Sequence, residues 1–277
     1  MAQRTHRRRR TSVERPDWLY GRHVIEAALG AGRRDLRRLL VRAGGSRSDL
    51  EKSISLARKA GIPVVEADSA QLAELAGAGP AGPRGAVLEA GPLPELDGVA
   101  GLCDPATGRS RDRRIVVLDG VEDPQNVGSI ARVSDAARAD GLVLTRHHSP
   151  PLTVAVTRAS AGAIEWLPVA RVTNLARALD ELKRSGFWVI AADPEAEEGL
   201  YTVPDRALSG DLAVVLGAEG RGLRPGVRRH VDHLLRIPML GQVESLNVAT
   251  AGAVLLYELM RRNPPIPQRG NSSTSDE

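Results

Sequence analysis

Three polar segments in the second half of the chain carry side chains that could do chemistry. They span residues 118–132, 216–223 and 237–252, and each follows directly on a short apolar run. Apolar runs of this length, separated by helical patterns, are typical of buried strands in a parallel sheet. Because α/β sheets usually place ligands at the carboxyl ends of their strands, these three segments are the most informative part of the chain for function.

The segment 118–132 is predicted to be a strand end, a tight turn and the start of a helix. Asp123 can cap this helix, and Pro124 suits its first position. Asn126 then lies in the first turn, and Arg132 projects roughly opposite the apolar face. Spacing alone therefore favours Arg132 as a solvated surface residue.

The segment 216–223 places three glycines around Glu219. Gly217, Gly220 and Gly222 permit close backbone approach and positive φ angles, which serve a ligand loop but also an ordinary turn. The segment lacks the Gly-Lys-Ser/Thr end of a Walker loop and the Gly-x-Gly-x-x-Gly spacing of a dinucleotide site. It is consistent with a ligand loop but does not identify a ligand.

The segment 237–252 is predicted to lead into a helix capped by Ser245. This helix is apolar nearly all round and includes small residues such as Gly252, so a buried core helix is expected. Asn247 lies near its start, where a buried amide needs hydrogen-bond partners.

These segments belong to an α/β domain predicted over residues 115–262. Its strand candidates are 115–118, 141–144, 188–191, 212–216 and 234–237. Short apolar runs separated by helices predict a parallel sheet covered on both faces.

A smaller α/β domain is predicted over residues 17–90. Helices are expected at 21–29, 48–60 and 69–75, and strands at 39–41, 62–65 and 86–89. Residues 91–114 are rich in Gly and Pro and are predicted to be a linker.

Both ends of the chain are expected to be disordered. Residues 1–16 are rich in arginine, and residues 263–277 are rich in Pro, Ser and Gly. The basic arm could bind nucleic-acid phosphates or serve only as a solubilising tail, and the sequence does not decide between the two.

The composition supports two α/β domains and a polyanionic partner. The chain of 277 residues is too long for one small core, and with 42% hydrophobic but only 3% aromatic residues its cores must be built from Ala, Val and Leu. Its formal net charge of +4 and pI near 9.7 suit RNA, DNA or an acidic membrane surface.

Cysteine usage and hydropathy indicate the compartment of the protein and its relation to metals and membranes. The single cysteine, Cys103, cannot form an intramolecular disulfide, and no zinc-ligand spacing is present, so we expect a reducing cytoplasm and no metal. No apolar run approaches the roughly 18 residues of a spanning helix, so a soluble protein without membrane contact is expected.

In their order and separations, the three segments resemble the three motifs of the SpoU/TrmH family of RNA ribose methyltransferases, a branch of the SPOUT superfamily. The resemblance extends through residues 20–22, 27–29, 160–163 and 167–175, and covers about 19–260. The most similar subgroup is the 23S ribosomal RNA guanosine 2′-O-methyltransferases.

The resemblance implies a fold, a cofactor and partners. It implies a SPOUT α/β domain with a deep trefoil knot, preceded by an RNA-binding domain similar to ribosomal protein L30e. Knots are too rare for periodicity to suggest one. It also implies S-adenosylmethionine as cofactor, RNA as substrate and a homodimer.

The resemblance also implies site residues. The catalytic residues implied are Asn126, Arg132, Glu219, Ser245 and Asn247. The cofactor-binding residues implied are Gly217, Glu219, Gly220, Ile237, Met239, Leu246 and Asn247.

Methyl transfer needs the ribose oxygen, the methyl carbon and the leaving sulfur in line, so positioning should supply much of the catalysis. No histidine or cysteine lies in the three segments to accept the proton. Because guanidinium is essentially always protonated, Arg132 is expected to stabilise the developing alkoxide and contact a phosphate. Solvent or an RNA phosphate would then accept the proton.

The chain departs from the family pattern at two places. It has Pro83-Arg84-Gly85 where relatives often carry His-Gln-Gly, and Ala249 where a serine is common. The alternatives are a transfer RNA methyltransferase or an antibiotic-resistance methyltransferase of the same family, and an RNA-binding protein that has lost transfer activity.

Overall fold

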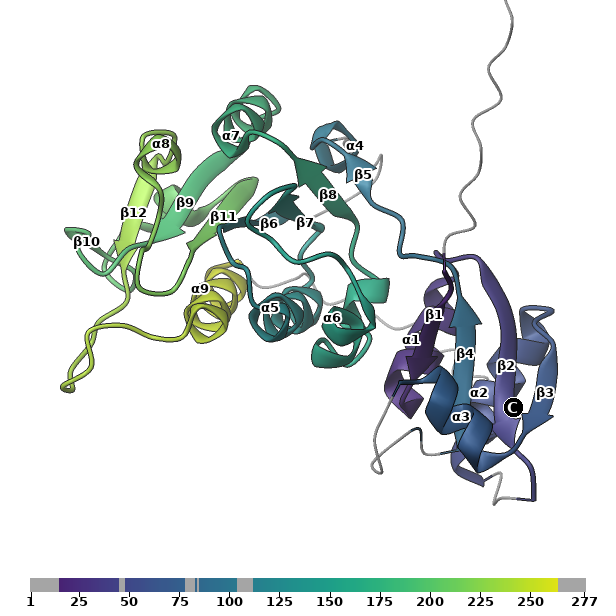
Figure 1. The fold of residues 1–277 in the computed structure, drawn as a ribbon. Helices are drawn as coiled ribbons and strands as arrows, with labels where there is room; N and C mark the ends of the chain where they lie inside the picture. The colour runs from purple at the N-terminus through teal and green to yellow at the C-terminus, as the bar shows by residue number, and fades with distance from the viewer. Residues whose placement is uncertain (1–14, 45–47, 78–82, 84, 104–111, 264–277) are drawn as a thin grey trace, which may run out of the picture. The chain divides into compact units, whose positions relative to one another are not determined.

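The computed structural model describes residues 15–44, 48–77, 83, 85–103 and 112–263 (Figure 1). Most of the basic arm, nearly all of the C-terminal tail and Arg84 therefore lie outside the described residues. The described chain forms two compact units. One extends to Pro94 and includes Leu152–Arg158, and the other contains Glu95–Pro151 and the chain from Ala159 onward.

The first unit is a four-stranded sheet in the order β1-β4-β2-β3. Its strands are β1 (Asp17–Tyr20), β2 (Leu36–Arg42), β3 (Val64–Ala67) and β4 (Ala86–Ala90). Its main helices are α1 (Arg22–Ala31), α2 (Glu51–Lys59) and α3 (Ser69–Leu75), with a 3-10 turn at Ser48–Leu50. Only β2 and β3 pair in parallel. The predicted helices and strands are confirmed to within a few residues, but β1 was not predicted.

The second unit is an eight-stranded sheet, and every strand pair in it is parallel. In the order β10-β12-β9-β11-β6-β7-β8-β5, β6 lies between β11 and β7. The strands are β5 (Leu96–Asp97), β6 (Arg114–Asp119), β7 (Gly141–Thr145), β8 (Val169–Val172), β9 (Trp188–Ala192), β10 (Glu198–Gly199), β11 (Leu212–Gly217) and β12 (His233–Arg236). The predicted parallel sheet is confirmed.

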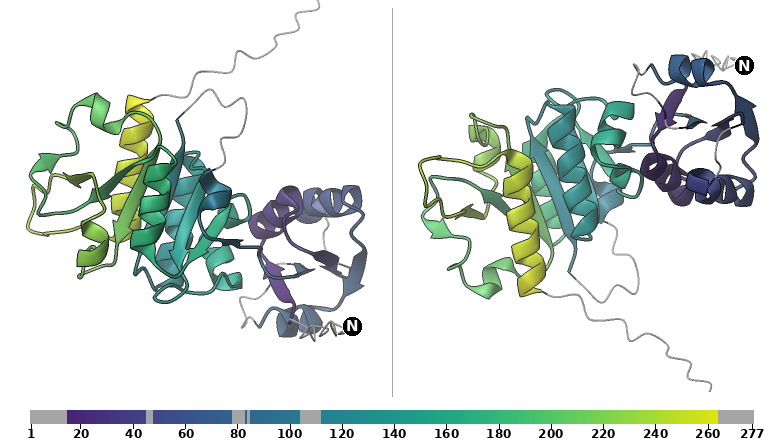
Figure 2. Two further views of the ribbon diagram at one scale, coloured as in Figure 1. Left: turned by 90° about the horizontal axis from the view of Figure 1, so that it is seen from above. Right: turned by 90° about the horizontal axis from the view of Figure 1, so that it is seen from below.

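Helices cover both faces of this sheet (Figures 1 and 2). On one face α5 (Pro124–Ala136) and α9 (Val248–Arg262) lie side by side. The other face carries α4 (Ala100–Cys103), α7 (Leu175–Arg184) and α8 (Pro225–Arg228), whose apolar side chains join one core cluster with the strands. The remaining short helices are α6 (Val154–Ala159) and 3-10 turns at Ala163–Glu165 and Asp205–Leu208.

Two sequence-based expectations are wrong in this unit. Residues 91–114 are not a linker alone, because β5 pairs with β8 and α4 contributes buried Leu102 to the core. The last helix begins at Val248, and its cap is Asn247 rather than Ser245. This helix is also not buried all round, since Thr250 and Tyr257 are exposed.

Candidate active site

The loops that follow β6 and β11 start from adjacent strands. Gly217 pairs with Asp119 at the last position of both strands, so the two loops leave the sheet at the same edge. The carboxylate of Asp119 is buried and accepts hydrogen bonds from the backbone N–H and the Nε of Arg224, at 2.8 and 2.6 Å. This ion pair fixes the far end of the second loop to the end of β6.

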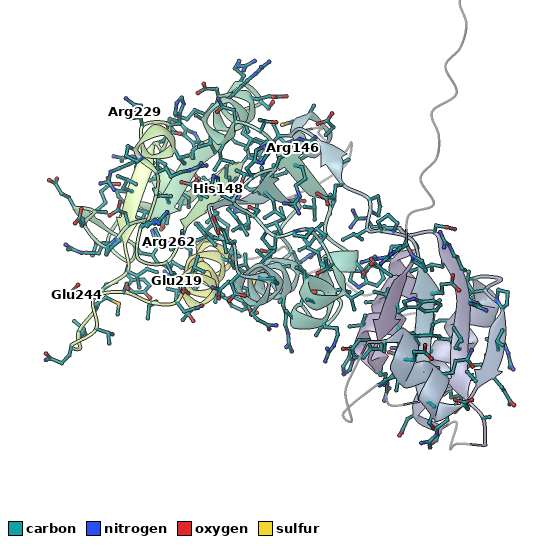
Figure 3. The ribbon with its side chains drawn as sticks, viewed as in Figure 1. Arg146, His148, Glu219, Arg229, Glu244 and Arg262 are labelled. Carbon is teal, nitrogen blue, oxygen red and sulfur yellow. The ribbon has the colours of Figure 1, made fainter. Side chains whose placement is uncertain are left out.

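Asn126, Glu219 and Asn247 meet at this edge, although they come from three different segments. Of the three, Glu219 is labelled in Figure 3. Asn247 Nδ2 lies 2.5 Å from Glu219 Oε1 and 3.0 Å from Asn126 Oδ1. Asn126 Nδ2 donates to the same Glu219 oxygen at 3.3 Å. We refer to these three residues as the amide–carboxylate cluster.

Local sequence holds two members of the cluster on helix starts. Asp123 caps α5 by accepting from Gln125 N at 2.9 Å, which places Asn126 in the first turn. Asn247 caps α9 through its Oδ1, which accepts from Ala249 N at 2.9 Å. Capping oxygens of this kind satisfy backbone donors that the helix leaves unpaired.

Glu219 is exposed, yet its Oε1 accepts hydrogen bonds from three N–H groups. Besides the two amides, Val248 N approaches Oε1 at 3.4 Å. The carboxylate therefore lies at the N-terminal end of α9, where the helix dipole is positive. The arrangement leaves a fixed acceptor at a solvent-accessible position.

Close backbone packing explains the glycines of these segments. A Cβ added at Gly217 would lie 2.5 Å from the carbonyl carbon of Gly222, and one added at Gly128 would lie 2.4 Å from the Cβ of Ala159. Gly220 has a φ of 73°, a left-handed conformation that favours glycine. The turn after β11 therefore depends on small residues for its shape.

The segment 237–247 extends away from the sheet between β12 and α9 (Figure 1). Ile237, Met239 and Leu246 are half-buried, whereas Leu240 is fully exposed. Among the described residues, none offers a hydrogen-bond partner to 237–246. Free backbone donors and acceptors next to apolar side chains match what an adenosine-containing cofactor requires, and the carboxyl edge of the sheet is where such a ligand binds.

Two residues implied as catalytic lie apart from the cluster. Arg132 is six residues after Asn126 on α5, which places it about 9 Å further along the helix axis. Its side chain is exposed and makes no ion pair or hydrogen bond within the described residues. Ser245 is likewise exposed and without such a partner among them.

Some contacts at this edge were not found by sequence reasoning. They include the Asp119–Arg224 pair and a contact of 3.1 Å between His148 Nδ1 and Glu122 Oε1. Asp119 ends a strand that reads as wholly apolar up to that point, so a carboxylate at the strand end was the available signal.

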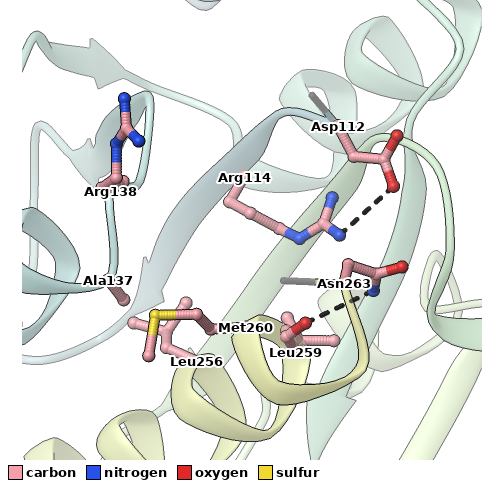
Figure 4. A pocket seen from close by; sticks show the side chains of 8 residues that line it. All are labelled: Asp112, Arg114, Ala137, Arg138, Leu256, Leu259, Met260 and Asn263. Carbon is pink, nitrogen blue, oxygen red and sulfur yellow. Dashed lines mark hydrogen bonds and ion pairs between the residues drawn. The ribbon is translucent and has the colours of Figure 1, made fainter. Parts of the chain in front are cut away.

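A separate hollow lies at the other end of β6 and α9 (Figure 4). Eight residues line it: Asp112, Arg114, Ala137, Arg138, Leu256, Leu259, Met260 and Asn263. Arg114 begins β6, whereas the cluster lies beyond its last residue, so this hollow is not the candidate active site. The described residues contain no group of acidic, histidine or cysteine side chains suited to a metal ion. They also contain no helix long and apolar enough to cross a membrane.

The fold and the site define a class: an α/β protein whose ligand loops meet at the carboxyl edge of a parallel sheet. Residues 113–257 match the SpoU rRNA Methylase family, and residues 18–94 match a family described as RNA 2′-O ribose methyltransferase substrate binding. The chain therefore belongs to the SpoU rRNA methylase family and is an RNA 2′-O-methyltransferase.

Relatives and solved structures agree with this assignment. The 23S rRNA (guanosine-2′-O-)-methyltransferase RlmB of Pseudomonas putida is 35% identical over 88% of this chain and 96% of its own length. A putative TrmH family tRNA/rRNA methyltransferase of Bacillus subtilis, YacO, is 35% identical over 90% of this chain and 97% of its own. A solved RNA 2′-O ribose methyltransferase is 28% identical and superposes with a TM-score of 0.70 over 90% of this chain and 89% of its own. The SpoU methyltransferase AviRb from Streptomyces viridochromogenes is 26% identical and reaches 0.71, with 89% of each chain covered.

Proposed function

We propose that this protein transfers a methyl group from S-adenosylmethionine to the 2′-hydroxyl of a guanosine in 23S ribosomal RNA. The observation that carries the proposal is the meeting of Asn126, Glu219 and Asn247 at the carboxyl edge of the sheet. The relatives named as 23S rRNA guanosine methyltransferases support the choice of RNA.

The turn after β11 and the segment 237–246 would hold the cofactor. Gly217 and Gly220 offer backbone without side-chain bulk, and Ile237, Met239 and Leu246 offer a partly buried apolar surface. When bound, S-adenosylmethionine supplies an electrophilic methyl group on a sulfonium.

The amide–carboxylate cluster would orient the ribose. Glu219 and the two amides present donors and acceptors of fixed position, which suits a hydroxyl that must be aligned for in-line attack. Arg132, free of partners in the described residues, would place its guanidinium against the developing alkoxide and an adjacent phosphate. Ser245 would line the opposite wall.

The finer expectations about architecture are part of this proposal. A trefoil knot is supported by the path of 237–247. This segment leaves β12, which lies two positions from β11 in the sheet, and it ends at Asn247, which contacts Glu219 in the loop after β11. An L30e-like RNA-binding role for the first unit is supported by its family match. Residues 17–90 are the proposed RNA-binding domain, the methyl-transfer domain is proposed to begin at Glu95, where the second unit starts, and the cytoplasm is the proposed location.

A homodimer through α9 is also proposed. Tyr257 is 47% exposed on this helix, and Ala253 and Val254 are half-buried. An apolar stripe on an exposed helix face suits an isologous contact. Light scattering should give a mass near twice 29.5 kDa, and a mass near 29.5 kDa at micromolar concentrations would oppose the dimer.

The experiment that tests the function uses the full chain, labelled S-adenosylmethionine and in vitro transcripts of 23S rRNA and of transfer RNA. We expect label in the 23S transcript, followed by mapping of one 2′-O-methylguanosine. Label only in the transfer RNA would favour the transfer RNA alternative. Cofactor binding without any transfer to either RNA would contradict the proposal.

A further inference from the structure

A loop outside the three motifs presents one arginine and two histidines at the same edge of the sheet as the candidate active site. It follows β7 and contains Arg146, His147 and His148, whose side chains are exposed; Arg146 and His148 are labelled in Figure 3. We refer to these three residues as the 146–148 ridge. Because β7 is the neighbour of β6 in the sheet, the ridge leaves the sheet at the same edge as the amide–carboxylate cluster.

One contact joins the ridge to the loop that follows β6. His148 Nδ1 lies 3.1 Å from Glu122 Oε1, four residues before Asn126. This contact places the ridge beside the loop that leads into α5 and Asn126.

A buried arginine holds both sides of this loop. Arg171, 8% exposed, donates to the carbonyl oxygen of Thr145 at 3.1 Å and to that of Pro150 at 2.6 Å. Its Nε also donates to the carboxylate of Glu95. Fixing the residues on both sides of the ridge lowers the entropy that would be lost when a ligand orders it.

A second set of contacts lies inside the loop. Thr145 is buried, and its hydroxyl donates to the carbonyl oxygen of His147. Ser149 Oγ lies 3.1 Å from Thr145 Oγ1. His148 has a φ of 62°, a left-handed conformation that is uncommon for a residue with a Cβ. Strained backbone of this kind persists where the surroundings determine it, and it is concentrated at binding sites.

The Arg146–Asp97 ion pair and the His148–Glu122 contact can both be exchanged for contacts with a phosphate. Arg146 pairs with Asp97 at 2.6 Å, but Asp97 is 92% exposed. In the pair of His148 with Glu122 both side chains are about two thirds exposed. Because such exposed pairs contribute little to stability, an RNA phosphate can compete with either carboxylate.

We propose that Arg146, His147 and His148 form a contact surface for the ribose–phosphate backbone of RNA beside the methylated nucleotide. The proposal rests on the proposed function, because it takes the RNA strand to enter at the edge where Asn126 lies. A planar guanidinium binds phosphate through two parallel hydrogen bonds. Imidazole N–H groups provide further donors to phosphate oxygens.

The test compares two double variants of the full chain. The ridge variant carries Arg146→Gln and His148→Asn, because asparagine tolerates a left-handed backbone. The control variant carries Arg184→Gln and Arg206→Gln, two exposed arginines that precede β9 and β11 and so lie at the opposite edge of the sheet. Affinity for a 23S rRNA transcript is measured over a range of KCl concentrations, together with KM and kcat for transfer and the affinity for S-adenosylmethionine.

We expect the ridge variant to bind the transcript about tenfold more weakly at about 0.1 M salt, and the slope of log affinity against log salt to fall by about one or two. KM for the transcript should rise by more than kcat falls, while the affinity for S-adenosylmethionine stays as in the unmodified protein. The control variant should match the unmodified protein. Equal affinity and equal slope in the ridge and control variants would overturn the proposal.

The outcomes separate this inference from the proposed function. Binding that depends on the ridge without methyl transfer would contradict the function alone, and transfer that is indifferent to the ridge would contradict the inference alone. Absence of any transcript binding by the unmodified protein would contradict both. If the ridge variant unfolds, Arg146→Gln alone gives the same comparison, because it leaves the backbone of His148 unchanged.

Discussion

The side-chain amide of Asn247 forms hydrogen bonds through both its nitrogen and its oxygen, and the nitrogen donates to Glu219. Its Nδ2 donates to Glu219 Oε1 at 2.5 Å, while its Oδ1 accepts from Ala249 N at 2.9 Å and Thr250 N at 3.3 Å. The same residue therefore begins α9 and positions the carboxylate of the candidate site.

Asn247→Ser should separate these two roles. Serine caps helices well, but its single O–H cannot replace an amide nitrogen that donates to both Glu219 and Asn126, so methyl transfer should fall by about a hundredfold while thermal stability is nearly kept. Asn247→Ala should lower both, with a loss of about 1 kcal/mol in the free energy of unfolding. Transfer rates and thermal unfolding of the two variants check this, and unchanged transfer in the serine variant would exclude the positioning role.

Arg132→Ala should lower transfer by roughly a hundredfold or more, the effect of losing one preorganised donor to a developing negative charge. Its side chain is exposed and unpaired within the described residues, so the free energy of unfolding should change little. Lysine should rescue poorly, because an ammonium lacks the planar fork. Single-turnover transfer is the measurement, with exposed Arg184→Ala as the control, and a rate equal to that control would return Arg132 to the surface interpretation.

Gly217→Ala should disturb the turn after β11, which is proposed to hold the cofactor. Its Cβ would meet backbone atoms of Gly222 and Leu223 at 2.5 to 2.8 Å, an overlap that costs about 1–3 kcal/mol. We expect affinity for S-adenosylmethionine to fall by about tenfold, which corresponds to 1.4 kcal/mol. Gly226→Ala is the matched control, since a Cβ there has no neighbour within 4 Å. Calorimetry that found equal affinities in both variants would contradict the expected role of the loop.

Glu258 should make stability depend on pH under acidic conditions. Hydrogen bonds from Arg261 and, more weakly, from Arg262 lower its pKa to about 2, against the opposing effect of burial. Because the folded pKa is below the unfolded value of 4.5, its contribution to stability is complete above pH 4.5 and is lost as the pH falls towards 2.

Replacing Glu258 tests this pH dependence. Glu258→Gln should remove this part of the dependence and cost about 2 kcal/mol near neutral pH, since Arg262, 5% exposed, loses a charged acceptor. Unfolding measured from pH 6 to pH 2.5 checks it, with exposed Glu197→Gln as the control. A Glu258→Gln variant with the same acid sensitivity as that control would contradict the assignment.

The sequence by itself determined the local structure around the site. Asp123 and Pro124 predict the start of α5, and the apolar runs predict β6, β7, β9, β11 and β12, because capping and burial depend on neighbouring residues. The same apolar runs predict the parallel sheet, and the resemblance of the three motifs predicts the family and the reaction. Sequence reasoning missed β5, β8 and β10, since very short edge strands and a strand between helices carry weak periodic signals.

Only the tertiary structure decided which residues meet. Glu219 reaches Asn126 because β11 pairs with β6 in register, and pairing between strands so distant in the chain leaves no local pattern. The same reason explains the cap of α9. Ser245 and Asn247 are both good N-caps by type, but in the structure it is Asn247 that donates to Glu219 and caps the helix at once, and the position of Glu219 is set by the sheet.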